Sequence, residues 1–420
     1  MLRADRLCVW IMIVGLILLV PSYNYVKFND ELCSMLFLCV ASLDCIVNRN
    51  WRRYRLLFAI IGVMTFYAIY TLAFKNYNTP RYVLVDWIIE IKPYIPFAVI
   101  FAIRPSMTSA EKQLVKAICI VDSVVVTLLL ACGETIVAAA VGHVTYIGLT
   151  LFTCSMLYLY CSVKDDGSIS RRDMAVALVM LTIGLGSTRS KYYAIYVLSL
   201  FFLLGYRPGM LRSMSVGKSI AVMAVVIAVI AVSWSKFDYY YISGGTGKFD
   251  RSVAESFARP VLYATSALIF AGQFPFGSGL ASFASFASKQ NYSGLYAEYG
   301  IDHVHGLSED TGFFICDAFF PSLAQFGVAG LVLFMAFWVY AYSFLRRMIR
   351  VEGVMSRYEV AIGILLILHI MIECTSGNTF TQPSGMIVMC LLGFICGKGA
   401  GLKVPEKECI MPQNLELKKI

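Results

Sequence analysis

The chain has 420 residues, of which 59% are hydrophobic, 14% aromatic and only 15% charged. Soluble domains stay near half apolar, so this composition excludes an ordinary soluble protein and predicts an all-α polytopic membrane protein. The net charge of +9 does not indicate a nucleic-acid partner, because the basic residues lie in short clusters between apolar runs, as topology signals do. Most of the 13 cysteines lie inside apolar runs and no CxxC motif occurs, which argues against a disulfide framework and against a thiolate metal site.

About twelve apolar runs are expected to cross the membrane. They are the segments 7–21, 31–47, 56–74, 82–103, 114–132, 143–162, 174–187, 191–205, 219–234, 322–345, 358–373 and 385–397. The first run follows Arg3 and Arg6 and has no small-x-small cleavage site after it, so we expect a retained helix and not a cleaved signal peptide.

The segments divide the chain into four parts. These are transmembrane helices 1–9 in 1–234, a large loop in 235–321, transmembrane helices 10–12 in 322–397 and a polar tail in 398–420. Basic clusters such as NRNWRRYR and RRMIRVEGVMSR occur in every second loop, which places those loops and both termini in the cytoplasm. The large loop between helices 9 and 10 then lies outside the cytoplasm. The short run 261–272 is expected to be interfacial or re-entrant, because a span there would reverse the position of the basic loop RRMIR.

Charged residues within the apolar segments are functional candidates, since a charge is unfavourable in a membrane. Asp86 and Glu90 share a helix face close to Lys92, as an internal ion pair or as part of a pathway. The turn GLGSTRSK carries Arg189 and Lys191 on the outer side, against the topology rule, which predicts an anionic partner there or else an exposed hairpin tip.

The large loop carries several candidates of its own. Arg251 and Arg259 flank the start of the short apolar run, and the interleaved aromatic residues suit either sugar rings or a membrane-interface belt. The stretch GIDHVHGLSEDTGFF, 300–314, brings together Asp302, His303, His305, Glu309 and Asp310. Its spacing matches no strong zinc signature, so a catalytic base or a solvated loop is favoured over a metal site. Further along, His369 and Glu373 are four residues apart, which we interpret as a helix-packing pair.

Several motifs between 174 and 345 resemble the bacterial O-antigen polymerase and O-antigen ligase superfamily of integral membrane glycosyltransferases. The first motif is the Ser/Arg turn with Arg189. The others lie in and after the loop: Arg259 four residues before Tyr263, the turn PFGSGLASF with Pro275, Gly277, Gly279 and Phe283, and the paired glycines Gly327 and Gly330.

The resemblance implies that Arg189 and Arg259 hold the diphosphate of an undecaprenyl-diphosphate-linked glycan, with Lys191 beside them and Arg251 as a weaker alternative to Arg259. Where ligases of this pattern carry a His-Asn pair, this chain has Cys316 and Asp317. The base that activates the acceptor is then expected among His305, Glu309, Asp310 and Asp317.

These departures favour a metal-independent polymerase of O-antigen, capsule or exopolysaccharide repeat units, with no cofactor. The resemblance also implies a bacterial inner membrane, with the large loop in the periplasm, and it implies the lipid bilayer, a chain-length regulator and a flippase as partners. Two alternatives remain open. One is an O-antigen ligase with lipid A-core as acceptor, and the other is a transporter or lipid-linked glycan flippase, for which the chain shows no clear repeat.

Overall fold

The computed structural model describes residues 3–207 and 257–402, together with the isolated residues 227, 231, 234, 238 and 239. Most of the predicted segment 219–234, residue Arg251 and the tail after Leu402 lie outside the described residues. Within the described ranges every regular element is a helix, so the all-α class is confirmed there.

Each predicted segment within the described ranges coincides with a helix or a helix pair. The N-terminal part holds α1 (Ala4–Ile17), α2 (Leu19–Ser22), α3 (Asn29–Asn48), α4 (Arg55–Phe74), α5 (Pro80–Ile91), α6 (Tyr94–Ile103), α7 (Ser109–Cys132), α8 (Glu134–Val141), α9 (Thr145–Ser162), α10 (Arg171–Ile183) and α11 (Ser190–Leu200). The C-terminal part holds α14 (Ala258–Gly272), α15 (Phe286–Gln290), α16 (Leu295–Glu298), α17 (Phe319–Ser322), α18 (Gly327–Glu352), α19 (Arg357–Cys374) and α20 (Pro383–Gly401).

Within the described ranges, four helical stretches are long and apolar enough to cross a membrane, namely Trp51–Phe74, Ser109–Cys132, Phe319–Glu352 and Pro383–Gly401. The pair α8 and α9, bent by 69°, adds a fifth if it forms one span. The apolar helices therefore indicate a membrane protein, whereas the number of twelve spans stays a prediction. The predicted segment 82–103 is two helices, because Pro93 lacks a backbone N–H and interrupts the helical hydrogen bonds between α5 and α6.

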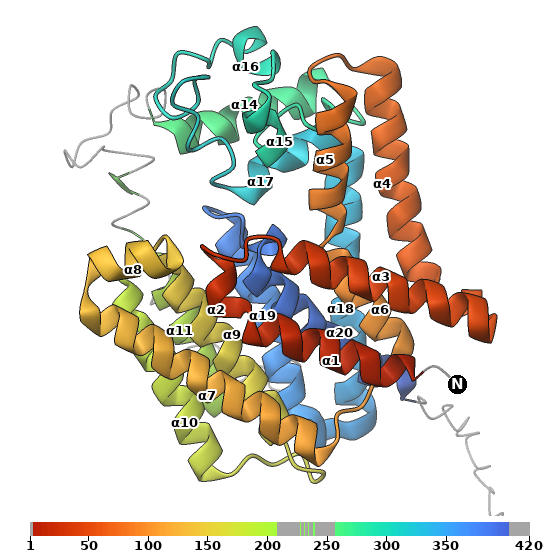
Figure 1. Ribbon diagram of the computed structural model, residues 1–420, viewed down its shortest axis with the longest axis vertical. Coiled ribbons are helices and arrows are strands. Elements are labelled where there is room, and N and C mark those ends of the chain that lie inside the picture. Colours follow the sequence, from red (N-terminus) through yellow and green to blue (C-terminus); the bar gives the residue numbers. More distant parts are fainter. Residues whose placement is uncertain are drawn as a thin grey trace, which may run out of the picture.

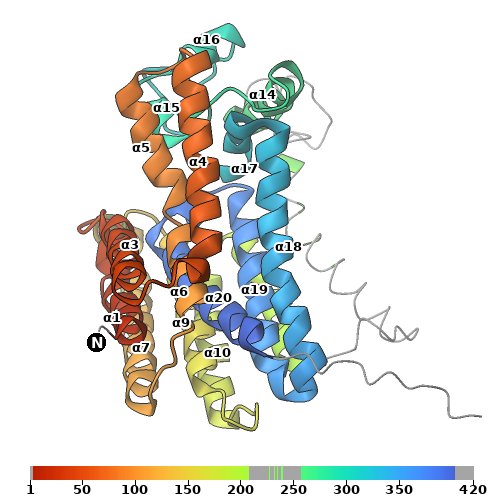
Figure 2. The ribbon, with the colours of Figure 1, turned by 90° about the vertical axis from the view of Figure 1, so that its right-hand side faces the viewer.

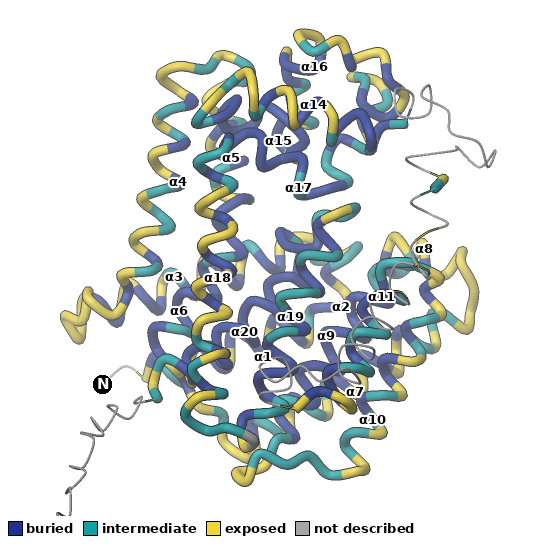
Figure 3. The backbone as a smooth tube through the Cα atoms, turned by 180° about the vertical axis from the view of Figure 1, so that it is seen from behind, coloured by how far each residue is buried: buried dark blue, intermediate teal, exposed yellow. Residues whose placement is uncertain are grey.

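The helices form a bundle that carries a smaller domain at one end (Figures 1 and 2). In the bundle, α9 and α20 are buried over almost their whole length, whereas α4 buries only Leu57, Met64, Tyr67 and Thr71 (Figure 3). Exposed apolar side chains on α4 suit a helix that faces lipid.

The predicted large loop folds, over 257–318, into a domain with its own apolar core, which we call the outer domain. Leu262 and Ile269 of α14 pack there with Phe283, Tyr296 and Leu307. The predicted short helix 261–272 is α14, which lies in this domain (Figure 1). The connection between helices is thus a folded unit that can form one wall of a binding site.

Two glycine turns attach the outer domain to α18. Gly277, with φ of +76°, packs so closely on the turn before α18 that a Cβ atom would lie 2.3 Å from the Ala324 carbonyl oxygen and 2.3 Å from the Gly327 nitrogen. Backbone hydrogen bonds from Gly279 N to Gln325 O at 2.9 Å and from Ala329 N to Pro275 O at 3.0 Å join the two turns. Two motifs of the family resemblance therefore form one structural joint in this chain.

Asp86 of α5 serves the same attachment. Asp86 is fully buried, and its Oδ2 accepts a hydrogen bond of 2.7 Å from the backbone N–H of Ala281 in the outer domain. Lys92 forms its ion pairs with Asp30 and Glu31 of α3. The expected internal pair within α5 is thus replaced by contacts between separate elements, which the spacing along one helix does not reveal.

Candidate functional site

A cavity of about 800 Å³ lies between the outer domain and the helical bundle. Its walls come from the starts of α9, α11 and α14, from the segment before α17 and from the turn between α19 and α20. The lining residues are His143, Thr145, Tyr146, Leu149, Thr188, Arg189, Ser190, Lys191, Ala194, Arg259, Tyr263, Phe314, Cys316, Asp317, Ile372, Thr375, Ser376, Gly377, Asn378, Thr379 and Gln382.

Three of the cations predicted from sequence converge on this cavity: Arg189, Lys191 and Arg259. Arg189 directly precedes α11, and Arg259 lies in the first turn of α14. The cavity also contains Thr145, the first residue of α9, and Gln382, which precedes α20. Since the N-terminal end of a helix carries a partial positive charge, these helix starts reinforce the cations and make the cavity suitable for an anion.

Arg189 is the cation best placed to receive a ligand. Its Nη2 lies 2.9 Å from Nε2 of His143, and its Nε is buried without a hydrogen-bond partner. Within the described part of the chain, no carboxylate lies at ion-pair distance from Arg189. A guanidinium held in this way can donate to the oxygen atoms of an incoming phosphate.

Lys191 is already engaged with the bundle. Its Nζ lies 2.7 Å from Oε2 of Glu373, which is only 3% exposed, and donates to the Ser376 carbonyl at 2.9 Å. Glu373 thus joins α19 to α11. His369 stacks on Phe152 of α9, with 4.0 Å between the ring centroids, so both residues serve helix packing as expected.

Arg259 and Asp317 form an ion pair in the wall of the cavity. Arg259 Nε donates to Asp317 Oδ2 at 2.8 Å, and Nη2 donates to the same oxygen. Both side chains are partly exposed to the cavity, at 22% and 30%. Arg259, predicted to bind the diphosphate, and Asp317, one of the predicted bases, thus form an ion pair with each other in this structure.

The remaining candidates lie away from the cavity. His305, Glu309 and Asp310 are exposed on the outer domain and do not line the cavity, and the His305 ring packs edge-on against Phe313 at 5.3 Å between centroids. Within the described ranges no cluster of three or more His, Cys, Asp or Glu residues is placed to hold a metal ion. The charged side chains of the stretch 300–314 are thus exposed, whereas Ile301, Val304 and Leu307 pack in the core of the outer domain. The catalytic role of the stretch stays a prediction.

Several cavity residues were not among the candidates from sequence. His143 lies in the short turn between α8 and α9, and Asn378, Thr379 and Gln382 lie in the polar turn TSGNTFTQP between α19 and α20. Both turns are expected on the same outer side as Arg189, which is the signal that could have identified them. The hydroxyl of Tyr263 donates to the Thr375 carbonyl at 2.7 Å and ties α14 to the second of these turns.

The chemistry of the cavity is that of an anion site with two acid–base candidates, Asp317 and His143. Burial raises the pKa of the Cys316 thiol, so it stays protonated near neutral pH and is a poor nucleophile. Asp317 is the only carboxylate among the described lining residues.

No protein-family model matches the chain, and no curated protein matches it either.

Proposed function

We propose that the protein is a membrane glycosyltransferase that polymerises polysaccharide repeat units carried on undecaprenyl diphosphate. The observation that carries the proposal is the convergence of Arg189, Lys191 and Arg259 on one cavity at the outer end of the bundle. The residues that the family resemblance assigns to diphosphate binding are thereby close together, although they are far apart in the sequence.

The cavity suits the charge changes of this reaction. An acceptor hydroxyl oxygen forms a bond to the anomeric carbon of the donor glycan, and the bond from that carbon to the diphosphate oxygen breaks. The hydroxyl proton passes to a base, and the electron pair leaves with the diphosphate. Arg189 and Arg259 stabilise the departing negative charge, as fixed cations do in a partly water-excluded site.

Asp317 has two roles in the proposed reaction. Before the donor binds, the Asp317 carboxylate accepts the hydrogen bonds of Arg259 that a phosphate oxygen of the donor would accept. When the diphosphate takes that place, Asp317 is released beside the acceptor and accepts the hydroxyl proton. Asp317 is thus free to act as a base only while a donor is bound.

The test is elongation by the purified protein in liposomes that contain only lipid-linked repeat units. Arg189→Ala and Arg259→Ala should each lower the rate about 100-fold or more, because removing one electrostatic donor to developing charge has an effect of that size. Arg81→Ala is the matched control, since Arg81 is exposed at the start of α5 and does not line the cavity.

The result also separates the alternatives. Normal polymer from both cavity variants would contradict the proposal. A protein that transfers glycan only when lipid A-core is supplied is a ligase. A protein that moves lipid-linked glycan across the bilayer without elongating it is a transporter.

A further inference from the structure

His143 faces a hydrogen-bond donor at each of its two ring nitrogens. It lines the cavity between the outer domain and the bundle, which we call the outer cavity. Its Nε2 lies 2.9 Å from Nη2 of Arg189, and its Nδ1 lies 3.2 Å from the backbone nitrogen of Thr145. Neither a guanidinium group nor a backbone N–H accepts a hydrogen bond, and a neutral imidazole accepts at one nitrogen only. Whichever nitrogen carries the ring proton, that N–H therefore points at another donor.

The contact with Arg189 determines which ring nitrogen carries the proton in this structure. It is the shorter of the two contacts, and its charged donor makes it the stronger hydrogen bond. Nε2 therefore accepts from Arg189, and the ring proton lies on Nδ1, opposite the N–H of Thr145. Because Thr145 is the first residue of α9, the helix itself supplies no acceptor for that N–H. Two donors at the cavity thus oppose each other.

Arg189 adds a third unsatisfied donor among the same residues. Its Nε is buried without a hydrogen-bond partner, and within the described ranges no carboxylate pairs with its guanidinium group. Donors of His143, Thr145 and Arg189 therefore lie beside one another in the lining of the outer cavity. An anion with several oxygen atoms, such as a diphosphate, supplies the acceptors that these groups lack.

We propose that His143 is a third ligand of the diphosphate, beside Arg189 and Arg259, and donates to it from Nε2. A phosphate oxygen takes the place between His143 and Arg189 and accepts from both. The ring gains a proton at Nε2 from solvent and loses the Nδ1 proton to solvent, so its charge is unchanged. Nδ1 then accepts from Thr145, which satisfies both ring nitrogens. The inference rests on the proposed function, and it leaves Asp317 as the base, because Nε2 of His143 is protonated in the complex.

The protonation of Nε2 distinguishes a ligand of the diphosphate from a positioning residue. A histidine that only holds Arg189 in place keeps Nε2 unprotonated in the complex, because Nε2 continues to accept from the guanidinium group. A histidine that donates to the diphosphate carries a proton on Nε2. The state of one nitrogen atom therefore decides between the two roles of His143.

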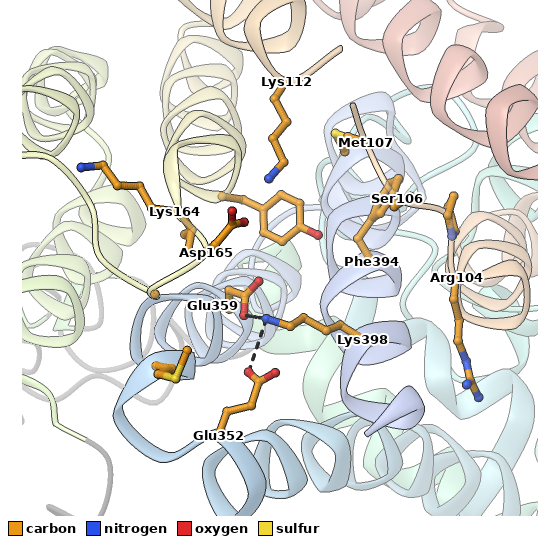
Figure 4. A pocket seen from close by; sticks show the side chains of 15 residues that line it. Arg104, Ser106, Met107, Lys112, Lys164, Asp165, Glu352, Glu359, Phe394 and Lys398 are labelled. Atoms are coloured by element: carbon orange, nitrogen blue, oxygen red, sulfur yellow. Dashed lines mark hydrogen bonds and ion pairs between the residues drawn. The ribbon is translucent and has the colours of Figure 1, made fainter. Parts of the chain in front are cut away.

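A second cavity, of about 450 Å³, lies at the far end of α18 and is unsuitable for the same anion. Lys398 is paired there with Glu359 at 2.6 Å and with Glu352 at 3.3 Å, as the dashed lines in Figure 4 show. Lys112 and Asp165 also line it, so three carboxylates oppose two ammonium groups (Figure 4). Diphosphate binding to the whole protein is thus expected at the outer cavity, and Lys112→Gln should leave it unchanged.

The experiment records nitrogen NMR spectra of the purified full-length protein, labelled with ¹⁵N-histidine, with and without undecaprenyl diphosphate. The chain has four histidines, so His143→Gln identifies the signals of His143. At about pH 8, above the usual titration range of histidine, we expect Nε2 to be unprotonated in the free protein and protonated in the complex. An Nε2 that stays unprotonated while undecaprenyl diphosphate binds would overturn the inference and leave the proposed function standing. Absence of binding by the wild type would contradict the proposed function, and the inference with it.

The affinity for undecaprenyl diphosphate gives a second test, among variants that elute as the wild type does in size-exclusion chromatography. His143→Ala removes a hydrogen bond to a charged group and should weaken binding about 10-fold or more. His143→Gln places an amide N–H near the position of Nε2 and should recover most of the loss, whereas His143→Asn reaches only the position of Nδ1 and should not. His303→Ala is the matched control, since His303 is exposed on the outer domain and does not line the cavity. Wild-type affinity in His143→Ala, recovery by His143→Asn, or an equal loss in the control would overturn the inference.

Discussion

Arg259 and Asp317 lie in the same ion pair, so a change at Asp317 affects both binding and chemistry. Asp317→Asn keeps the size of the side chain and removes its charge. Because Asn competes less for Arg259, the KM for the lipid-linked donor should fall several-fold. Because the base is lost, kcat should fall about 100-fold or more. Steady-state elongation kinetics in liposomes measure both constants.

A purely structural role for Asp317 gives another pattern. A carboxylate that only holds Arg259 in place would leave donor binding weaker after the substitution, with little change in kcat. An unchanged kcat in Asp317→Asn would therefore reject Asp317 as the base and return attention to His305, Glu309 and Asp310.

Lys191 and Glu373 can be tested as a pair. Lys191→Ala leaves Glu373 buried without its cation, and breaking such a pair destabilises a protein by about 3 kcal/mol or more. The double variant Lys191→Ala/Glu373→Gln removes both charges and should recover most of the loss in thermal unfolding in detergent. If the double variant also elongates glycan normally, Lys191 joins α11 to α19 and does not bind the donor. A double variant less stable than Lys191→Ala would contradict the pairing.

At the scale of elements, the joint between the outer domain and α18 sets the shape of the cavity. Gly277→Ala places a methyl group 2.3 Å from backbone atoms of the partner turn, at a positive φ that itself disfavours alanine by about 1–2 kcal/mol. We expect a lower unfolding temperature and reduced elongation. Gly294→Ala in the same domain is the control, since its φ is −60° and no atom lies within 4 Å of the added methyl group. Equal effects of the two substitutions would contradict the joint.

The positions of the helices were easier to predict from the sequence than the contacts between elements. Apolar runs located each described segment, because a stretch of helix in a membrane or a buried core must be apolar over most of its length. The folded core of the outer domain was not predicted, since it depends on contacts such as Phe283 with Tyr296 that composition does not show.

For the site, several individual residues were predicted from the sequence, but their partners were not. Arg189, Lys191, Arg259 and Asp317 were predicted from charges in unusual places and from motifs, and the structure brings them to one cavity. The pairing of Lys191 with Glu373 was not predicted, because it joins residues 182 positions apart. His143 was missed because only its place in a turn on the outer side, and no local motif, marks it as a candidate.

In the whole molecule, the outer domain and the loop between α9 and α10 are expected on opposite sides of the membrane. A protease-cleavable tag inserted after Gly300, in the outer domain, should be cut in intact spheroplasts. A tag after Asp166, in the loop between α9 and α10, should be protected until the membrane is opened. This expectation rests on the basic residues Lys164, Arg171 and Arg172 in and beside that loop. The reverse pattern, or cleavage of both tags in intact spheroplasts, would contradict the orientation.

The central claim is that the outer cavity binds a lipid diphosphate through Arg189 and Arg259. The most direct measurement is the affinity of the purified protein for undecaprenyl diphosphate, compared with the monophosphate, in wild type, Arg189→Ala, Arg259→Ala and the control Arg81→Ala. The account predicts tighter binding of the diphosphate by wild type and the control, and a loss of that preference in both cavity variants. Equal affinity for the diphosphate in all four proteins would contradict it.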